Sequence, residues 1–255
     1  MTLPPRAAAG RVFEAQRRVR LSDTDADGRL RLDAVARYLQ DVAADDVADA
    51  GWAADEHVWV VRRTLLDVVR PFLGDEEVEL ATWCSGIGAA AAARRTSLAG
   101  DRGGAIEAES VWIHLDRELR PARFGERFLA VYAPTAEGRG VSTRFSLAAP
   151  PADSTRAPWP LRATDVDLLG HVNNAAYWAA VEEVAAGSLG EPLRAELEYR
   201  QPIDLGETVE VVSAPGGRAV WLVVDGAVRA AAALVQRGSI QTARASPSSS
   251  PPPAE

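Results

Sequence analysis

The sequence predicts an α+β fold in which one structural unit occurs twice. Each half of the chain reads as a strand, a polar turn, a helix and a run of antiparallel strands. The residues also correspond, since the turn at 23–28 (Asp-Thr-Asp-Ala-Asp-Gly) matches 165–170 (Asp-Val-Asp-Leu-Leu-Gly) at an offset of 142, from 165 − 23. Further along, residues 63–71 match 194–202 at an offset of 131, from 202 − 71. A repeated element order with aligned residues indicates an internal duplication.

The first half carries the clearer of the two patterns. Residues 12–21 alternate as in a strand, and residues 22–28 form an Asp-rich turn. Apolar residues at 32, 35, 39, 42 and 47 have helical spacing, and the helix is expected to end near Gly51. Strands are expected at 58–70, 77–85, 90–99 and 105–116, with the Gly-rich turn 100–104 closing a hairpin.

The second half repeats this order after a stretch without clear periodicity. Residues 119–128 are expected to form a connecting turn, and residues 136–158, rich in Ala, Pro, Gly and Ser, an interdomain linker. A helix at 174–187 then precedes strands at 193–201, 207–214, 219–224 and 227–236. The sequence thus predicts an N-terminal domain at 12–135, a C-terminal domain at 159–236 and a disordered tail at 237–255.

Composition narrows the class of protein. A hydrophobic share of 47% with 25% charged residues is typical of a soluble globular protein. The net charge of −8 disfavours a nucleic acid or an anionic membrane as the main partner. No apolar run approaches the roughly 20 residues of a membrane span and no signal-peptide order is present, so the cytoplasm is the expected location. The single cysteine, Cys84, is expected to be a packed core thiol, and no motif suggests a metal or another cofactor.

Residues 165–177 are the segment richest in chemically active side chains. Asp167 and His171, the only His of the C-terminal half, come just before a helix that Asn173 and Asn174 open. Asn suits a helix start, where free backbone N–H groups and the helix dipole can stabilise a carbonyl oxygen that gains negative charge. Asp167 could take or direct a proton, and His171 could titrate near neutral pH. A capped turn without a catalytic role is the alternative interpretation of these residues.

On these residues the chain resembles the double-hotdog acyl-ACP thioesterases of plants and bacteria. The second half is similar to that family's D-x-N-x-H-V-N-N-x-x-Y segment through residues 167–177, and the first half is similar through residues 59–62, 74–83 and 109–116. The resemblance covers about residues 12–236. It implies tandem duplicated hotdog domains, in each of which a bent antiparallel sheet wraps around one long helix.

The resemblance also implies a reaction and a set of site residues. The family hydrolyses the thioester of a fatty acid on the pantetheine arm of acyl carrier protein, without a cofactor, and holds the acyl chain in the N-terminal hotdog domain. Asp167 and His171 match the family's active-site Asp and His, and Asn173 and Asn174 open the helix that polarises the carbonyl. The residues expected to contact substrate are Tyr177, Trp59, Trp83 and Trp112.

Two positions depart from the family pattern. Leu169 stands where the family has Asn, and Pro202 lies where plant members have an acid shortly after the Glu-Tyr-Arg strand. The remaining D-x-x-G-H segment is closer to single-hotdog acyl-CoA thioesterases. Asp25 resembles the acid in their D-T-D-x-x-G opening, so a first-half active site is an alternative, although Arg29 and Leu32 replace the His and Asn there.

The predicted function is hydrolysis of fatty acyl-ACP by a monomer or homodimer, since a duplicated chain already contains the two-hotdog unit. An arginine patch formed by residues 62–63 and 94–95 is a candidate docking surface for the acidic carrier protein. The alternatives are an acyl-CoA thioesterase, a non-catalytic acyl-binding protein, and a hotdog dehydratase. The dehydratase would turn over crotonyl or 3-hydroxyacyl thioesters without releasing a thiol.

Overall fold

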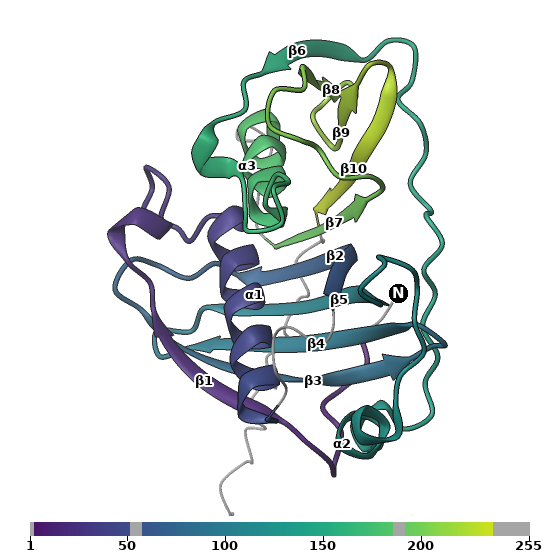
Figure 1. Ribbon diagram of the computed structural model, residues 1–255. Coiled ribbons are helices and arrows are strands. Elements are labelled where there is room, and N and C mark those ends of the chain that lie inside the picture. The colour runs from purple at the N-terminus through teal and green to yellow at the C-terminus, as the bar shows by residue number, and fades with distance from the viewer. Residues whose placement is uncertain (1–2, 52–57, 186–191, 237–255) are drawn as a thin grey trace, which may run out of the picture.

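The computed structural model describes residues 3–51, 58–185 and 192–236. In these ranges ten strands form one antiparallel sheet in the order β1-β3-β4-β5-β2-β7-β10-β9-β8-β6. Helices α1 and α3 lie against the same side of this sheet, in front of it in Figure 1. The predicted tail lies outside the described residues. The two hotdog units therefore share a single continuous sheet.

The first half follows the predicted order closely. Its elements are β1 (Phe13–Arg18), α1 (Leu32–Asp49), β2 (Val58–Arg70), β3 (Glu77–Ile87), β4 (Ala91–Gly100) and β5 (Ala105–Leu115). The apolar face of α1 that the spacing predicted is buried through Val35, Leu39 and Val42. Gly51 follows the helix with a positive φ, which explains why the helix ends there.

The second half has the same elements in shorter form. They are β6 (Thr155–Trp159), α3 (Asn174–Ala185), β7 (Leu193–Tyr199), β8 (Val209–Ser213), β9 (Ala219–Val224) and β10 (Ala227–Gln236). Asp225 and Gly226 both have positive φ, as a two-residue hairpin turn between β9 and β10 requires. The predicted bounds of β9 and β10 are confirmed, and residues 186–187 of the predicted helix lie outside the described part of the chain.

The two halves are related by an approximate two-fold axis between β2 and β7. Strand order runs β1-β3-β4-β5-β2 on one side and β6-β8-β9-β10-β7 on the other. At the junction β2 pairs with β7 from Arg63 opposite Glu198 to Val68 opposite Leu193. This pairing makes the duplication visible in space and places α1 beside α3.

One hydrophobic core serves both halves. It contains residues from α1, from α3 and from strands on each side of the β2–β7 junction. Trp178 of α3, Leu66 of β2 and Leu197 of β7 have no exposed surface. Because the two central helices and the shared sheet enclose the same core, the helix starts keep fixed positions relative to each other.

Two elements lie where sequence analysis expected none. Helix α2 (Glu126–Ala136) begins within the predicted connecting turn and buries Phe128 and Tyr132 against residues of β3 and β4. Pro134 inside it obscured the helical pattern. Strand β6 begins within the predicted linker, ends at Trp159 and pairs with β8. Most of β6 is exposed and it contains Pro158, so it lacks the alternation that identifies a strand.

The segment 143–148 is fixed against the sheet where the two halves meet. The Ser146 and Leu147 N–H groups donate to Glu198 Oε1 at 2.5 and 3.0 Å, and Arg200 Nη2 donates to the Leu147 carbonyl at 2.6 Å. The guanidinium of Arg62 lies 3.6 Å from the centre of the Phe145 ring. Part of the predicted linker is thus bonded to both β2 and β7.

Candidate functional site

The segment 165–173 forms a tight turn that delivers the chain to α3. The Asp167 N–H donates to the His171 carbonyl at 2.9 Å, and the Gly170 N–H donates to the Asp167 carbonyl at 3.0 Å. The Asn173 N–H closes the turn by donating to the Asp165 carbonyl at 2.7 Å. Gly170 has φ +82, a value that side chains disfavour, and this requirement explains the glycine. The turn holds Asp167 and His171 ahead of the same helix start.

The equivalent turn in the first half has the same backbone bonds. The Asp25 N–H donates to the Arg29 carbonyl at 2.8 Å, and the Gly28 N–H donates to the Asp25 carbonyl at 3.1 Å. Isolated bridges join Arg29 to Leu73 and His171 to Asp204, which correspond at offsets of 142 and 131. Any functional difference between the turns therefore comes from side chains.

Asn173 and Asn174 have different places at the start of α3. Asn173 is the N-cap, and its Oδ1 accepts the Ala175 N–H at 2.9 Å while its carbonyl accepts the Ala176 N–H at 2.9 Å. Asn174 is the first helical residue, and its N–H has no hydrogen-bond partner among the residues that the structure describes. This N–H can bind an incoming oxygen atom with the favourable end of the helix dipole behind it.

His171 is held by an acid that sequence analysis missed. Its Nδ1 lies 2.5 Å from Asp204 Oδ1, and 44% of the His171 side chain is exposed. Asp204 comes two residues after Pro202, where the acid was sought. The sequence repeat could have pointed to it, because Asp204 aligns with Leu73 at the offset of 131, and Leu73 forms the equivalent bridge with Arg29. An acid on Nδ1 fixes the ring orientation and leaves Nε2 free to face a substrate.

The carboxylates of Asp167 and Asp25 make similar turn contacts. Asp167 Oδ1 accepts the Leu169 N–H at 2.9 Å, whereas Asp25 Oδ1 accepts the N–H groups of Asp27 and Arg29, both at 2.9 Å. Leu169, which replaces the family's Asn, is 58% exposed. One oxygen of Asp167 thus supports the turn. The contacts of the carboxylates alone do not separate the first-half and second-half candidates.

A mostly apolar cavity of about 320 Å³ lies along the C-terminal part of α1. Trp59 and Trp112, two of the predicted substrate-contact residues, line it. Trp83 and Tyr177 do not. Trp83 is buried under the Arg95 guanidinium, 5.4 Å from the ring centre, and Tyr177 packs edge-on against Tyr199 in the core. The remaining lining residues are Gln40, Ala43, Ala44, Val47, Ala48, Cys84, Ala92, Ala93, Arg94, Phe128 and Tyr132.

The charged residue that lines the cavity, Arg94, is paired with a buried acid. Arg94 Nη1 lies 2.8 Å from Asp46 Oδ2, and Asp46 is buried and also accepts Arg11 Nε at 2.7 Å. Burial raises the pKa of the Cys84 thiol to about 11, so the thiol stays protonated near neutral pH, as expected for a core residue. Alkyl groups suit such a cavity better than charged ligands do.

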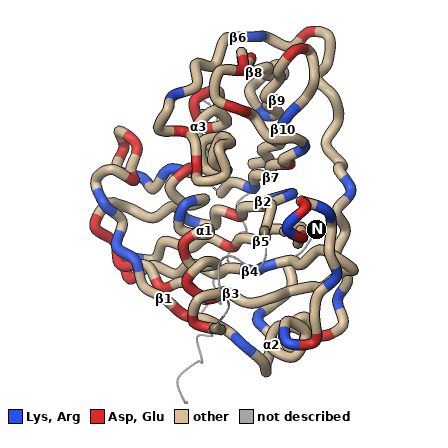
Figure 2. Tube along the Cα trace, viewed as in Figure 1, with Lys and Arg blue, Asp and Glu red and all other residues tan. Residues whose placement is uncertain are grey.

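The predicted arginine patch is absent from the surface. Arg95 is 5% exposed in its side chain and pairs with Glu107, Arg94 pairs with Asp46, and Arg63 lies 3.7 Å from Glu196. Across both halves, Figure 2 shows basic and acidic residues interspersed on the trace. The expectation of this docking patch is wrong, because three of the four side chains lie against acidic neighbours and Arg62 lies over the Phe145 ring.

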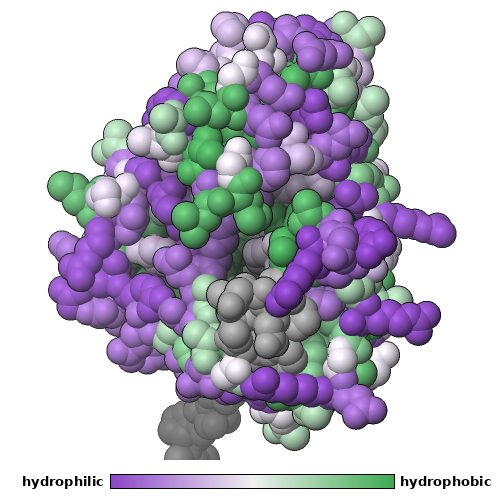
Figure 3. All heavy atoms as spheres, in the orientation of Figure 1, coloured by the Kyte–Doolittle hydropathy of each residue, from purple (hydrophilic) through white to green (hydrophobic). Residues whose placement is uncertain are grey.

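Hydrophobic residues on the visible face gather over α3 and near the junction of the halves (Figure 3).

None of the helices in the described residues has the length and apolar composition needed to cross a bilayer. Within the described ranges no group of three His, Cys, Asp or Glu side chains is arranged to hold a metal ion.

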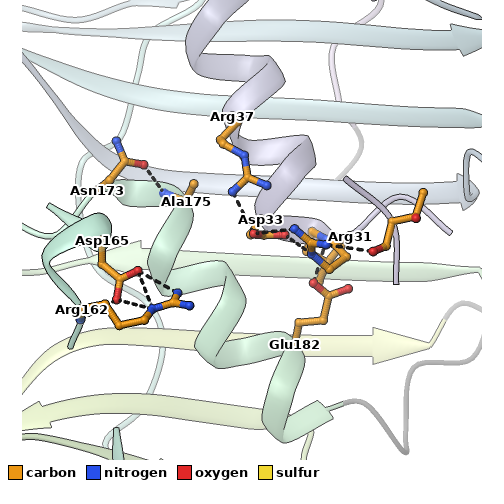
Figure 4. A network of polar contacts seen from close by, with 10 residues as sticks. Arg31, Asp33, Arg37, Arg162, Asp165, Asn173, Ala175 and Glu182 are labelled. Atoms are coloured by element: carbon orange, nitrogen blue, oxygen red, sulfur yellow. Dashed lines mark hydrogen bonds and ion pairs between the residues drawn. The ribbon is translucent and has the colours of Figure 1, made fainter. Parts of the chain in front are cut away.

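Glu182 reaches from α3 to the start of the other central helix. Its Oε2 accepts the N–H of Leu32, the first residue of α1, at 3.0 Å. Figure 4 shows Glu182 pointing toward this helix start, beside the ion pairs that Asp33 makes with Arg31 and Arg37. Burial, reinforced by the nearby charge of Asp33, raises the pKa of Glu182 to about 7. A side chain of the second half thus occupies the helix start of the first half.

Comparisons with known proteins match most of the chain. Residues 10–132 match the acyl-ACP thioesterase N-terminal domain, and residues 148–242 match the acyl-ACP thioesterase C-terminal domain. An uncharacterized protein of Mycobacterium tuberculosis, found in two strains, is 37% identical over 214 residues, which cover 83% of this chain and 86% of the relative.

Solved structures share the whole fold. An acyl-ACP thioesterase from Bacteroides thetaiotaomicron superposes with a TM-score of 0.75 at 18% identity, over 88% of this chain and 97% of that one. The 12:0-ACP thioesterase from Umbellularia californica gives a TM-score of 0.71 at 20% identity, over 87% and 95% of the two chains. With both domain matches in chain order on this double-hotdog sheet, the chain belongs to the acyl-ACP thioesterase family, and its reaction is hydrolysis of acyl-ACP thioesters to fatty acid and carrier thiol.

Proposed function

We propose that this hydrolysis takes place at the start of α3, with the acyl chain in the cavity beside α1. The observation that carries the proposal is the Asn174 N–H, which has no partner in the described part of the chain and stands beside a turn holding Asp167 and an Asp204-oriented His171. The cavity in the first half has the apolar lining that a fatty acyl chain needs.

The chemistry uses water as the nucleophile. Asp167 takes a proton from water as the water oxygen attacks the thioester carbonyl carbon. The carbonyl oxygen gains negative charge and is held by the Asn174 N–H. The carbon–sulfur bond then breaks, the carbonyl re-forms, and the leaving sulfur receives a proton from Nε2 of the His171 imidazolium, whose Nδ1–H is bound to Asp204. Asp167 then releases its proton to solvent and His171 takes one up, which restores both groups. The products are a fatty acid and the thiol of the carrier.

The second half is favoured over the first for two reasons. Its helix start is open, whereas the Leu32 N–H at the start of α1 is bound to Glu182. The second half also supplies His171 with an acid partner, and the equivalent position in the first half is Arg29. Asp25 therefore serves its turn and has no catalytic partner of this kind.

The proposed reaction requires acyl carrier protein as the partner and no cofactor. We place it in the cytoplasm, where carrier-bound acyl chains are made. A monomer already contains both halves, with the start of α1 set against the middle of α3, so the site needs no residue from a second chain, and a homodimer is equally compatible.

The proposal is tested by following thiol release, with a disulfide reagent, from acyl-ACPs and acyl-CoAs of graded chain length. We expect release from acyl-ACP to be faster than from the acyl-CoA of the same length. Faster turnover of acyl-CoA would move the activity to that substrate class. Absence of release with acyl chains still bound would favour the binding protein, and crotonyl-thioester turnover without thiol would favour the dehydratase.

Filling the cavity is expected to change chain-length preference. Ala92 is buried and lines the cavity, so Ala92→Phe places a ring in space that a long acyl chain would fill. Each methylene left unburied costs about 0.8 kcal/mol, so displacing two lowers activity on long chains about tenfold relative to short ones. The ratio of the two rates in one preparation controls for loss of folded protein. An unchanged ratio would show that the acyl chain lies elsewhere.

A further inference from the structure

The two central helices meet the opposite half of the molecule in equivalent ways. Helix α1 begins at Leu32 and α3 begins at Asn174, which are equivalent under the two-fold axis at an offset of 142. Glu182 lies eight residues into α3 (182 − 174), and Gln40 lies eight residues into α1 (40 − 32). Glu182 bonds the first N–H of α1 at 3.0 Å, so the two-fold relation assigns Gln40 the corresponding place on α1, opposite the start of α3.

The two pairs differ in chemistry. At the start of α1 the carboxyl of Glu182 fills the position of an incoming oxygen. At the start of α3 neither the Asn174 N–H nor the Gln40 carboxamide has a hydrogen-bond partner in the described residues. Gln40 also lines the acyl cavity. Of the lining residues in α1, it is the nearest in sequence to Leu32, where α1 begins. The cavity lining thus includes the α1 residue that corresponds to Glu182.

We propose that Gln40 is a catalytic residue whose carboxamide N–H binds the thioester carbonyl oxygen together with the backbone N–H of Asn174. This inference rests on the proposed function, since it assigns a second donor to the same site. Glu182 shows that a side chain at this helix position reaches the first N–H of the opposite helix. An amide in the corresponding place can donate to an oxygen atom that the Asn174 N–H also binds, whereas a carboxylate can only accept and takes the place of that oxygen.

The difference between amide and carboxylate decides which helix start can work. A carbonyl oxygen that becomes negative is stabilised by two N–H donors and repelled by a carboxylate. Glu182 consequently closes the first-half position to substrate and stabilises α1, while Gln40 keeps the second-half position open. Gln40 further places the reacting carbonyl at the cavity end nearest α3, so the acyl chain extends along α1 toward α2.

The test uses Gln40→Met, which keeps side-chain length and helix propensity but removes the donor. Removing one donor of an oxyanion site costs about 10²–10³ in kcat. We expect a loss of this size at every acyl-chain length, with KM changed less than about threefold, because the bond strengthens as charge develops. A residue that only lines the cavity would instead change KM and chain-length preference. Equal kcat in Gln40→Met and wild type overturns the proposal.

Gln40→Glu is the sharper variant, because it places a carboxyl opposite the start of α3, as Glu182 does at the start of α1. We expect it to lose more activity than Gln40→Met while its thermal unfolding stays cooperative. Glu182→Gln is the matched control, since it makes the reverse exchange at the equivalent position, and kcat should stay within about twofold of wild type. Full activity of Gln40→Glu would contradict the assignment.

The outcome also separates this inference from the proposed function. If wild type releases thiol, Asp167→Ala does not and Gln40→Met does, then hydrolysis occurs at α3 and only the role of Gln40 is wrong. If Asp167→Ala retains full activity, the proposed site itself is wrong.

Discussion

Replacing Asp167 with Ala is expected to lower thiol release from acyl-ACP by about 10²–10⁴-fold, the usual contribution of a general base. The loss should appear in kcat, because water activation occurs after the substrate has bound. Substrate binding should persist, since the cavity that would hold the acyl chain lies along α1 and includes no residue of this turn. The measurement is a single-turnover rate with acyl-ACP, together with a binding titration of the same variant.

Asp25→Ala is the matched control for this experiment. It removes two turn hydrogen bonds, from Asp27 and Arg29, whereas Asp167→Ala removes only the one from Leu169. The control therefore disturbs its turn at least as much and should still keep activity within about twofold of wild type. If Asp25→Ala abolishes release and Asp167→Ala does not, the reaction belongs to the first half.

Replacing Glu198 with Ala is expected to lower the free energy of unfolding by about 3–5 kcal/mol, the cost of removing one partner of a buried charged pair. Glu198 is fully buried, and its carboxylate accepts the Ser146 and Leu147 N–H groups and Arg200 Nη2. The variant leaves the Arg200 charge without its acid partner. It also removes bonds that hold segment 143–148 on the sheet.

Urea unfolding measures this effect, and Glu210→Ala provides the control. Glu210 is a glutamate on β8 whose ion pair with Arg156, at 3.0 Å, is exposed on both sides. Its loss should cost no more than about 1 kcal/mol. If the two variants are equally stable, segment 143–148 is not anchored through Glu198 and contributes little to joining the halves.

Most of the fold could be predicted because its elements carry strong periodic signals. The helix beginning at Leu32 has a regular apolar face, and the Asp225-Gly226 turn fixed the bounds of β9 and β10. Helix α2 and strand β6 could not be predicted in the same way. One contains a proline and is held by contacts with distant strands, and the other is exposed and stabilised only by pairing with β8.

The residues of the candidate site likewise differ in how well the sequence predicts them. Asp167, His171 and Asn173 form a continuous segment with a recognisable order, so their common turn could be expected. Asp204 follows another strand, and its contact with His171 depends on a bridge between segments 33 residues apart. Gln40 lies in the other half of the molecule, and only the spatial relation between the helices points to it.

The fusion of two related halves in one chain allows the two helix starts to diverge. In a homodimer of single-domain subunits, one codon sets both equivalent positions, so a closed glutamate on one side would close the other as well. Here Gln40 and Glu182 are separate positions under separate selection. One start can be optimised for holding the molecule together and the other for chemistry, at the cost of giving up one of two potential sites.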